Sequence, residues 1–301
     1  MKKYLSAVIL LLVITLSLFA CSSDKKSTSK SKSSSSRTET TKKDSTISRN
    51  LLVKSAENTQ KQKSVEIKGT ISLNGDGTGL PVNGDLLISG VQSFEKNESQ
   101  ISIDMTSLFG SLGGGGVEST DPIIIETRTV DGFTYTKTPS ILGSASSWKK
   151  AKAVSASGNS TQDPSQFLEY FKGAKDDYKT IGKEDIDGVS TTQYQVTLSP
   201  ENLKKQAKAS GGDLSDDSIE AIEKTFTKDI VANVWIDKNS LIKKFEMTLS
   251  IDDTSLLAPG SGAPGGSGAP GGKLTMVVTM NYFNYGVDVN VKAPAASEIT
   301  P

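Results

Sequence analysis

Side chains that commonly catalyse reactions or bind metals are scarce in this sequence of 301 residues. It has no histidine and one cysteine, which excludes Ser-His-Asp and Cys-His catalysis, histidine-ligated zinc, internal disulfides and CxxC redox chemistry. Adjacent carboxylates occur at Asp176-Asp177, Asp216-Asp217 and Asp252-Asp253. Neighbours on a strand point to opposite faces, and acids at a helix start stabilise its dipole, so solvation or capping is favoured over catalysis. With no GxxxxGK[ST] or GxSxG motif, the sequence indicates a protein that is not an enzyme and uses no metal or cofactor.

The single cysteine stands at the end of an apolar segment. Two lysines precede a run from Leu5 to Ala20, which is short for a transmembrane span but typical of an export signal. Leu18-Phe19-Ala20-Cys21 resembles the lipobox of bacterial lipoproteins. We therefore expect residues 1–20 to be a lipoprotein signal peptide, and Cys21 to carry the lipid anchor on the extracytoplasmic face of the cell membrane. The alternative is an ordinary signal peptide that contains a cysteine by chance.

Residues 21–49 are expected to form a disordered tether behind the lipidated cysteine. Positions 22–49 hold 11 Ser, 5 Thr and 6 Lys but one aliphatic residue, so they lack the apolar surface needed to fold. A flexible coil of this length spans about 30 Å. Its formal charge is +5, against −7 for residues 50–301. The basic stalk suggests either attraction to anionic lipid or wall polymer, or a solvated spacer.

From residue 65 onward, apolar and polar side chains alternate with a period of two, which predicts half-buried strands. Strict alternation favours an antiparallel sheet with one solvated face, because buried parallel strands are apolar throughout. Tight turns are expected at Asp131-Gly132 and Asp187-Gly188, and a further turn at Asp237–Ser240. The alternating segments are 65–73, 101–105, 194–198, 245–251 and 274–282.

Helices are fewer, and their start signals are clear. They are predicted over residues 51–60, from Asp163-Pro164 onward, from Ser199-Pro200 to about Ala209, and over about 217–226. Runs of strands separated by these helices, without a βαβ rhythm, define an α+β fold with a long antiparallel sheet and helices gathered on one side.

Three glycine-rich loops interrupt this pattern. In a meandering sheet, the loops at 74–83 and 106–121 lie at the same end, whereas residues 253–272 repeat Gly-Ser-Gly-Ala-Pro-Gly and cannot pack. The first loop partly matches a calcium-binding pattern, but a polar hairpin loop is favoured because the flanking segments are strands. The matching residues are Asn74, Asp76, Thr78, Gly79 and Asp85.

All methionines after Met1 fall on the apolar side of predicted strands. Flexible thioethers can line a surface that accepts acyl chains of varying shape, although filling gaps in a core is the alternative. If a few short helices do not fill the apolar face of a long sheet, that face forms a ligand cavity. We expect it to be lined by Ile67, Ile71, Leu86, Ile88, Ile103, Met105, Met247, Leu249, Met276, Val278 and Met280.

Short signatures are scattered over residues 50–295. In chain order they are Asp131-Gly132-Phe133-Thr134-Tyr135, Trp148-Lys149, Asp163-Pro164, Gly182-x-Glu184, Asp187-Gly188, Tyr194-x-Val196, Val234-Trp235-Ile236-Asp237, Leu241-Ile242-Lys243-Lys244 and Tyr282-x-x-Tyr285-Gly286. Their order and spacing resemble the LppX/LprAFG family of bacterial lipoproteins, which have a LolA/LolB-like half-barrel. The resemblance implies a strongly curved antiparallel β-sheet, short helices covering its concave face, an apolar cavity for lipid or glycolipid, and no catalysis. The chain departs from the family in its Gly-Ala-Pro repeat and in its loop at 113–116.

Together these features predict a membrane-anchored extracytoplasmic lipoprotein. Its domain, residues 50–301 with a Gly/Pro-rich loop at 258–272, would bind acyl chains for lipid transport or sensing in the cell envelope. The expected partners are a lipid or glycolipid ligand and the membrane, through acylated Cys21, with no nucleic acid. The alternative is a non-catalytic surface interaction or signalling module with a filled core, whose loops 106–121 and 253–272 contact a protein or wall partner.

Overall fold

The computed structural model describes residues 39–76, 83–111, 122–139, 146–153, 178–199, 201, 229–251 and 272–300. Its helices are α2 (Glu39–Gln60), α3 (Thr106–Ser111) and the 3-10 turn η2 (Ala296–Glu298). The strands of the first half are β1 (Ser64–Asp76), β2 (Asn83–Ser93), β3 (Glu98–Asp104), β4 (Ile124–Val130), β5 (Phe133–Lys137) and β6 (Trp148–Lys152). Those of the second half are β7 (Tyr178–Ile186), β8 (Val189–Leu198), β9 (Ile230–Asp237), β10 (Ile242–Ile251), β11 (Lys273–Phe283) and β12 (Ile299–Thr300).

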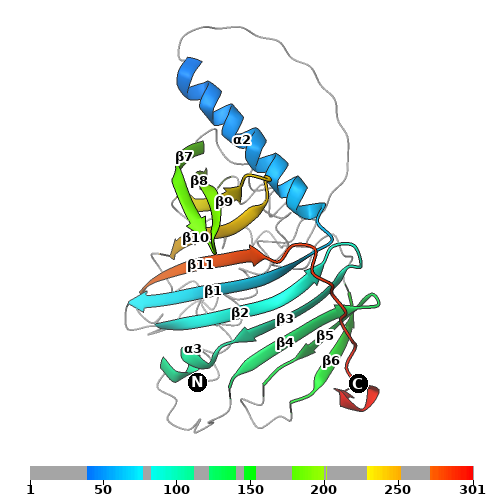
Figure 1. Ribbon diagram of the computed structural model, residues 1–301. Helices are drawn as coiled ribbons and strands as arrows, with labels where there is room; N and C mark the ends of the chain where they lie inside the picture. The colour runs from blue at the N-terminus through cyan, green and yellow to red at the C-terminus, as the bar shows by residue number, and fades with distance from the viewer. Residues whose placement is uncertain are drawn as a thin grey trace.

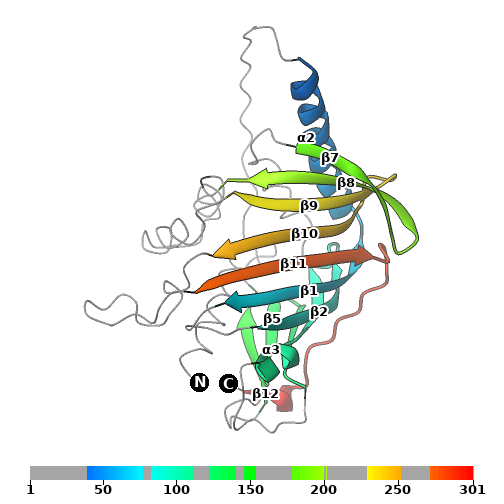
Figure 2. The same ribbon diagram turned by 90° about the vertical axis from the view of Figure 1, so that its left-hand side faces the viewer.

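The described strands form one open sheet of twelve strands, in the order β12-β6-β5-β4-β3-β2-β1-β11-β10-β9-β8-β7. Two meanders, β1–β6 and β7–β11, meet where β1 pairs with β11. The strand direction changes strongly between β5–β6 and β8–β11, so the sheet is twisted and curved, and its edges β7 and β12 do not meet (Figures 1 and 2). The described structure is therefore mostly β, and the predicted alternating segments lie in strands except for Met105, which directly follows β3.

The predicted turns are confirmed by the backbone. Asp131 and Gly132 have φ values of 54° and 75°, and Asp187 and Gly188 have values of 50° and 77°. Two successive left-handed residues form the turn that suits the twist of a tight hairpin. The hairpins β4–β5 and β7–β8 follow from these turns. At the third turn, the Asp237 carboxylate accepts hydrogen bonds from the backbone N–H groups of residues 239 and 241, at 2.8 and 2.9 Å.

One strand pair departs from the antiparallel prediction. The segment after β11, residues 284–300, runs across the sheet from its centre to the edge next to β6 (Figure 1). There, Ile299 and Thr300 of β12 pair in parallel with Trp148 and Lys149 of β6. The sheet is therefore mixed rather than wholly antiparallel. The path of the tail across the strands decides whether its end pairs in parallel or antiparallel with the edge strand. The alternation of side chains along a strand does not indicate that path.

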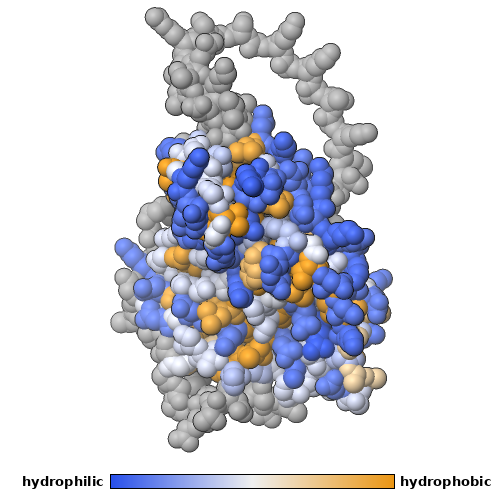
Figure 3. All heavy atoms as spheres, in the orientation of Figure 1, coloured by the Kyte–Doolittle hydropathy of each residue, from blue (hydrophilic) through white to orange (hydrophobic). Residues whose placement is uncertain are grey.

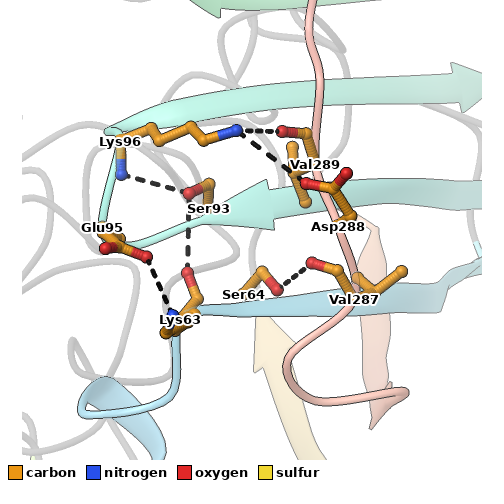
Figure 4. Close-up of polar contacts among 8 residues, drawn as sticks. All are labelled: Lys63, Ser64, Ser93, Glu95, Lys96, Val287, Asp288 and Val289. Carbon is orange, nitrogen blue, oxygen red and sulfur yellow. Dashed lines mark hydrogen bonds and ion pairs between the residues drawn. The ribbon is translucent and has the colours of Figure 1, made fainter.

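Polar contacts hold this C-terminal tail to the β1–β3 region (Figure 4). The Ser64 hydroxyl donates a hydrogen bond to the carbonyl of Val287. The Lys96 ammonium donates to the carbonyl of Val289 at 2.7 Å and lies 3.9 Å from the Asp288 carboxylate. Because both hydrogen bonds have backbone carbonyls of the tail as acceptors, they depend on its path, and only the ion pair depends on a side chain of the tail.

Helix α2 begins at Glu39, which is earlier than predicted. The predicted helix covered 51–60, and residues 39–49 were expected to belong to the disordered tether. The C-terminal half of α2 is fixed by packing, since Leu52, Ala56 and Thr59 are fully buried on one side of it. Once a helix is nucleated, each further residue costs little, and residues 39–49 contain no glycine or proline to stop it.

Several predicted segments lie outside the described residues. These are the signal segment with Cys21, the helices expected from Asp163 and over 217–226, most of the helix from Ser199, and the Gly/Pro-rich loop. The cover of the sheet by short helices therefore stays a prediction. Among the described helices, none is long and apolar enough to cross a membrane.

The strands bury side chains on both faces of the sheet. The larger cluster occupies one face over β1–β3 and β8–β11. A smaller cluster on the opposite face joins Val130, Tyr135 and Trp148 to Val289 and Val291 of the tail. The sequence predicted that this opposite face would be solvated; the tail covers part of it. Elsewhere on the tail side, hydrophilic side chains dominate the surface (Figure 3).

Candidate ligand-binding face

Strand register brings the predicted ligand residues to one face of the sheet, which we call the apolar face. In one row across the strands, Leu86 of β2 is opposite Ile71 of β1, which is opposite Val278 of β11 and then Met247 of β10. Because side chains alternate along each strand, neighbours two residues away share this face. The next rows add Leu249, Met276, Met280, Ile88, Ile103 and Ile67.

The remaining predicted residue, Met105, follows β3 directly and joins the same cluster. Its N–H group donates a hydrogen bond to the carbonyl of Ile123 at 2.8 Å. All four methionines after Met1 are buried in this cluster, with exposures of 2–5%. The prediction that they lie on the apolar side of the strands is confirmed, whereas contact with a ligand stays a prediction.

Cover of the apolar face is uneven. Leu86 and Val278 are buried, at 1% and 5% exposure, yet Ile71 between them is only half-buried. Ile103 and its cross-strand neighbour Ile125 are half-buried as well. Among the predicted ligand residues, Ile71 and Ile103 are thus the least covered, and Ile125 of β4 extends the half-buried area next to Ile103.

A glycine makes room for one of the methionines. A Cβ atom placed on Gly69 of β1 would lie 2.4 Å from the Sδ atom of Met280 and 2.9 Å from the carbonyl oxygen of Thr279, both on β11. The thioether of Met280 therefore lies directly against the backbone of β1. Sequence reasoning missed this contact, because an isolated glycine in a strand indicates close approach without naming the partner.

Helix α2 packs against β7 and β10 at one side of the sheet. The Thr59 hydroxyl accepts a hydrogen bond from the N–H group of Ile242 at 3.1 Å. The Tyr285 hydroxyl donates to the carbonyl of the same residue. Burial raises the pKa of Tyr285 above its ordinary range, so this phenol keeps its proton and remains a donor. These bonds fix the start of β10 beneath the helix.

Helix α3 packs against the start of β2, where a Cβ atom on Gly84 would lie 2.8 Å from the Cα atom of Leu108. Leu108 is fully buried. This contact places the chain before β2 next to the chain after β3, as predicted for loops 74–83 and 106–121; residues 77–82 and 112–121 lie outside the described part. Helix α2 thus packs mainly at the edge strand β7, and α3 packs at the start of β2.

Over β4 and β5 the same face becomes polar. Thr127 and Thr129 of β4 are opposite Thr136 and Thr134 of β5, and we call these four residues the threonine strip. The hydroxyl oxygens of Thr129 and Thr134 are 3.4 Å apart. The alternation Thr-x-Thr is visible in the sequence of β4 and of β5, but only register shows that both pairs continue the face that carries the predicted ligand residues.

The Val-Trp-Ile-Asp signature serves both faces of β9. Val234 and Ile236 are buried in the cluster of the apolar face. Trp235 points to the other face, where its indole N–H donates to the Glu184 carboxylate at 2.6 Å and the Lys244 ammonium lies 4.2 Å from its ring centre. This signature is thus explained by packing and hydrogen bonding within the sheet.

The described residues include no group of three acidic, histidine or cysteine side chains placed to hold a metal ion. All three adjacent carboxylate pairs fall outside the described part, as do Thr78 and Gly79 of the partial calcium pattern. Over β1–β3 and β8–β11, the apolar face therefore offers dispersion contacts and burial of hydrocarbon.

Several solved structures are similar to this chain over most of its length. The lipoprotein LppX of Mycobacterium tuberculosis is similar, with 14% identity and a TM-score of 0.44 over 82% of this chain and 99% of that chain. LprF of Mycobacterium bovis is also similar, with 11% identity and a TM-score of 0.44 over 83% of this chain and 98% of that chain.

A LolA superfamily protein from Nitrosomonas europaea shows a weaker similarity, with 11% identity and a TM-score of 0.25 over 81% of this chain and 94% of that chain. No family model matches the chain, and no curated protein matches it.

Proposed function

We propose that this protein is a membrane-anchored extracytoplasmic lipoprotein that binds acyl chains of a lipid on its apolar face, for lipid transport or sensing in the cell envelope. The observation that carries this proposal is the alignment of all predicted ligand residues in one continuous face, with four thioether side chains among them. No catalytic step is part of the proposal.

The energetics of the face suit a hydrocarbon ligand. Each methylene group transferred from water to an apolar surface contributes about 0.8 kcal/mol, so a long acyl chain needs few polar contacts. Ile71, Ile103 and Ile125 offer a point of access, since they are half-buried. Deeper residues such as Met276 and Leu249 are each 2% exposed, so a bound chain must displace the atoms that now cover them. Flexible thioethers make such repacking less costly than rigid side chains would.

Membrane attachment is proposed from the lipobox-like sequence that ends at Cys21. Metabolic labelling with palmitate in a bacterial host tests it directly. We expect label on the wild-type chain and none on Cys21→Ala; equal labelling of both would contradict the anchor.

Native mass spectrometry of residues 22–301, followed by solvent extraction, tests the ligand. We expect about one co-purifying acyl lipid per chain, and we expect Met247→Lys and Met280→Lys to lose it because a charge would face the hydrocarbon. Ile71→Trp, at a half-buried position, gives a second variant that blocks the face with less risk to folding. Leu87→Lys is the matched control, since Leu87 lies on the opposite face and is 51% exposed. Lipid retained by folded apolar-face variants would contradict the proposal.

The alternative, a surface interaction or signalling module with a filled core, is favoured by one observation. Most residues of the apolar face are buried by the chain itself. Under this alternative, residues 22–301 purify ligand-free and thermally stable, and deleting residues 259–272 abolishes function. Under the lipid-binding proposal, the same deletion only alters ligand access.

A further inference from the structure

We propose that a group of lysines at the β5–β6 end of the sheet docks the folded domain on the surface of an anionic membrane. The group consists of Lys137 on β5 and Lys149, Lys150 and Lys152 on β6, and we call it the lysine patch. This contact goes beyond the proposed function, because it needs no bound acyl chain and is separate from the proposed anchor at Cys21.

Positive charge is concentrated in this part of the chain. Residues 124–152, which include β4–β6, contain five basic and two acidic residues, a formal charge of +3, whereas residues 50–301 carry −7. Within the described part of the chain, no lysine of the patch forms an ion pair, although Lys63, Lys96 and Lys244 do. Unpaired positive charge on one side of an acidic domain attracts an anionic surface and orients the domain toward it.

The lysines of β6 surround one edge of the sheet. Lys149 points to one face, whereas Lys150 and Lys152 point to the other, and all three are exposed. Beyond β6 in the sheet lies the short strand β12, whose two residues pair with Trp148 and Lys149. The ammonium groups can therefore reach lipid headgroups together when this edge meets a membrane.

Aromatic rings lie next to these lysines. The ammonium nitrogen of Lys150 is 3.8 Å from the centre of the half-buried Phe133 ring, and that of Lys137 is 5.9 Å from the Trp148 ring. Lysine stems packed on apolar rings, with the ammonium in water, are typical of protein surfaces that lie between headgroups and acyl chains. A soluble anionic polymer needs only the charge, so the rings favour a membrane as the partner.

The patch is also separate from the point where the tether enters the domain. Helix α2, which continues from the tether, packs mainly against β7, at the other edge of the sheet from β6 (Figure 1). A second contact at β6 would fix the orientation of the sheet on a membrane, which a flexible tether leaves free. It would also bring β4, with the half-buried Ile125, close to the bilayer.

Sedimentation with vesicles tests this contact in residues 22–301, which lack the acylated cysteine. One set of vesicles contains equal parts of phosphatidylcholine and phosphatidylglycerol, and the other contains phosphatidylcholine alone. The patch variant is K149Q/K150Q/K152Q, and K149R/K150R/K152R keeps the charge. The matched control is K61Q/K183Q/K238Q, which removes the same charge from exposed lysines elsewhere. All variants carry the same basic tether.

We expect the wild-type chain to bind the phosphatidylglycerol vesicles in preference to phosphatidylcholine, and this binding to weaken as salt is added. A lysine near an anionic membrane surface strengthens binding by about fivefold. The glutamine variant should therefore bind about a hundredfold more weakly, because three lysines are removed. The control should stay within about threefold of the wild type, and the arginine variant should bind as the wild type does.

Equal losses in the glutamine variant and the control would overturn the inference, because net charge and not the patch would then explain binding. A wild-type chain without preference for phosphatidylglycerol would overturn it as well. Binding to immobilised polyphosphate but not to the vesicles would overturn it in favour of an anionic polymer. Co-purification of an acyl lipid tests the proposed function separately, and it should be the same in the glutamine variant as in the wild type.

Discussion

Replacing Gly69 by alanine tests how closely the two central strands pack on the apolar face. The added Cβ atom would lie 2.4 Å from the Met280 Sδ atom and 2.9 Å from the Thr279 carbonyl oxygen, both closer than such atoms approach in folded proteins. The thioether can rotate away, but the carbonyl belongs to the backbone of β11. Forcing a methyl group into a packed core costs about 1–3 kcal/mol. The lower backbone entropy of the unfolded alanine chain offsets about 0.5–1 kcal/mol.

Urea and thermal unfolding of residues 22–301 measure this cost, and a shift of about 2–4 °C in Tm is expected per 1 kcal/mol. Gly182→Ala is the control, since no atom lies within 4 Å of a Cβ placed there. Met280→Ala alone should cost about 2–5 kcal/mol. In the Met280→Ala background, Gly69→Ala should lower the free energy of unfolding by about 1 kcal/mol less than it does in the wild type, because the Met280 Sδ atom is no longer there. Equal costs of Gly69→Ala in both backgrounds would refute the packing described for these strands.

Further predictions concern the rest of the sheet. Trp148→Ala should destabilise the protein by about 3–5 kcal/mol and make the C-terminal tail sensitive to limited proteolysis, because Trp148 is the largest side chain in the cluster that holds Val289 and Val291 of the tail. Unchanged proteolysis would contradict this prediction. Glu184→Ala should lower the free energy of unfolding in urea by about 1–3 kcal/mol, since the buried Trp235 indole loses its hydrogen-bond acceptor. The control is Lys183→Ala, because Lys183 is the exposed residue next to Glu184. Burial raises the pKa of Tyr285 above the ordinary 10.0, so the stability associated with its protonated form is complete below pH 10.0 and is lost as the pH rises above it. Tyr285→Phe should cost about 1 kcal/mol at pH 8 and show a smaller fall in stability at about pH 11; an unchanged fall would exclude Tyr285 as its cause.

Local patterns were sufficient to predict β1, β3, β8, β10 and β11 and the three turns, whereas β12 was not predicted. Alternation in segments such as 274–282 shows which side chains share a face, because the period of a strand is two whatever it pairs with. Asp-Gly at 131–132 and 187–188 predicted tight hairpins, because both residues adopt positive φ readily. The composition of residues 39–49 was a poorer guide, since α2 extends into them from a half that is fixed by packing.

The sequence by itself determined that the chain has no histidine and a single cysteine, where its alternating strands lie, and which of their residues share the apolar side. Those properties depend on residue type and on spacing within one segment. Only the tertiary structure decided that β1 pairs with β11, that the tail covers Trp148 on the opposite face, and that the threonine strip continues the apolar face. Such contacts join residues far apart in the chain, so their register depends on how whole strands fit together, which no local pattern encodes.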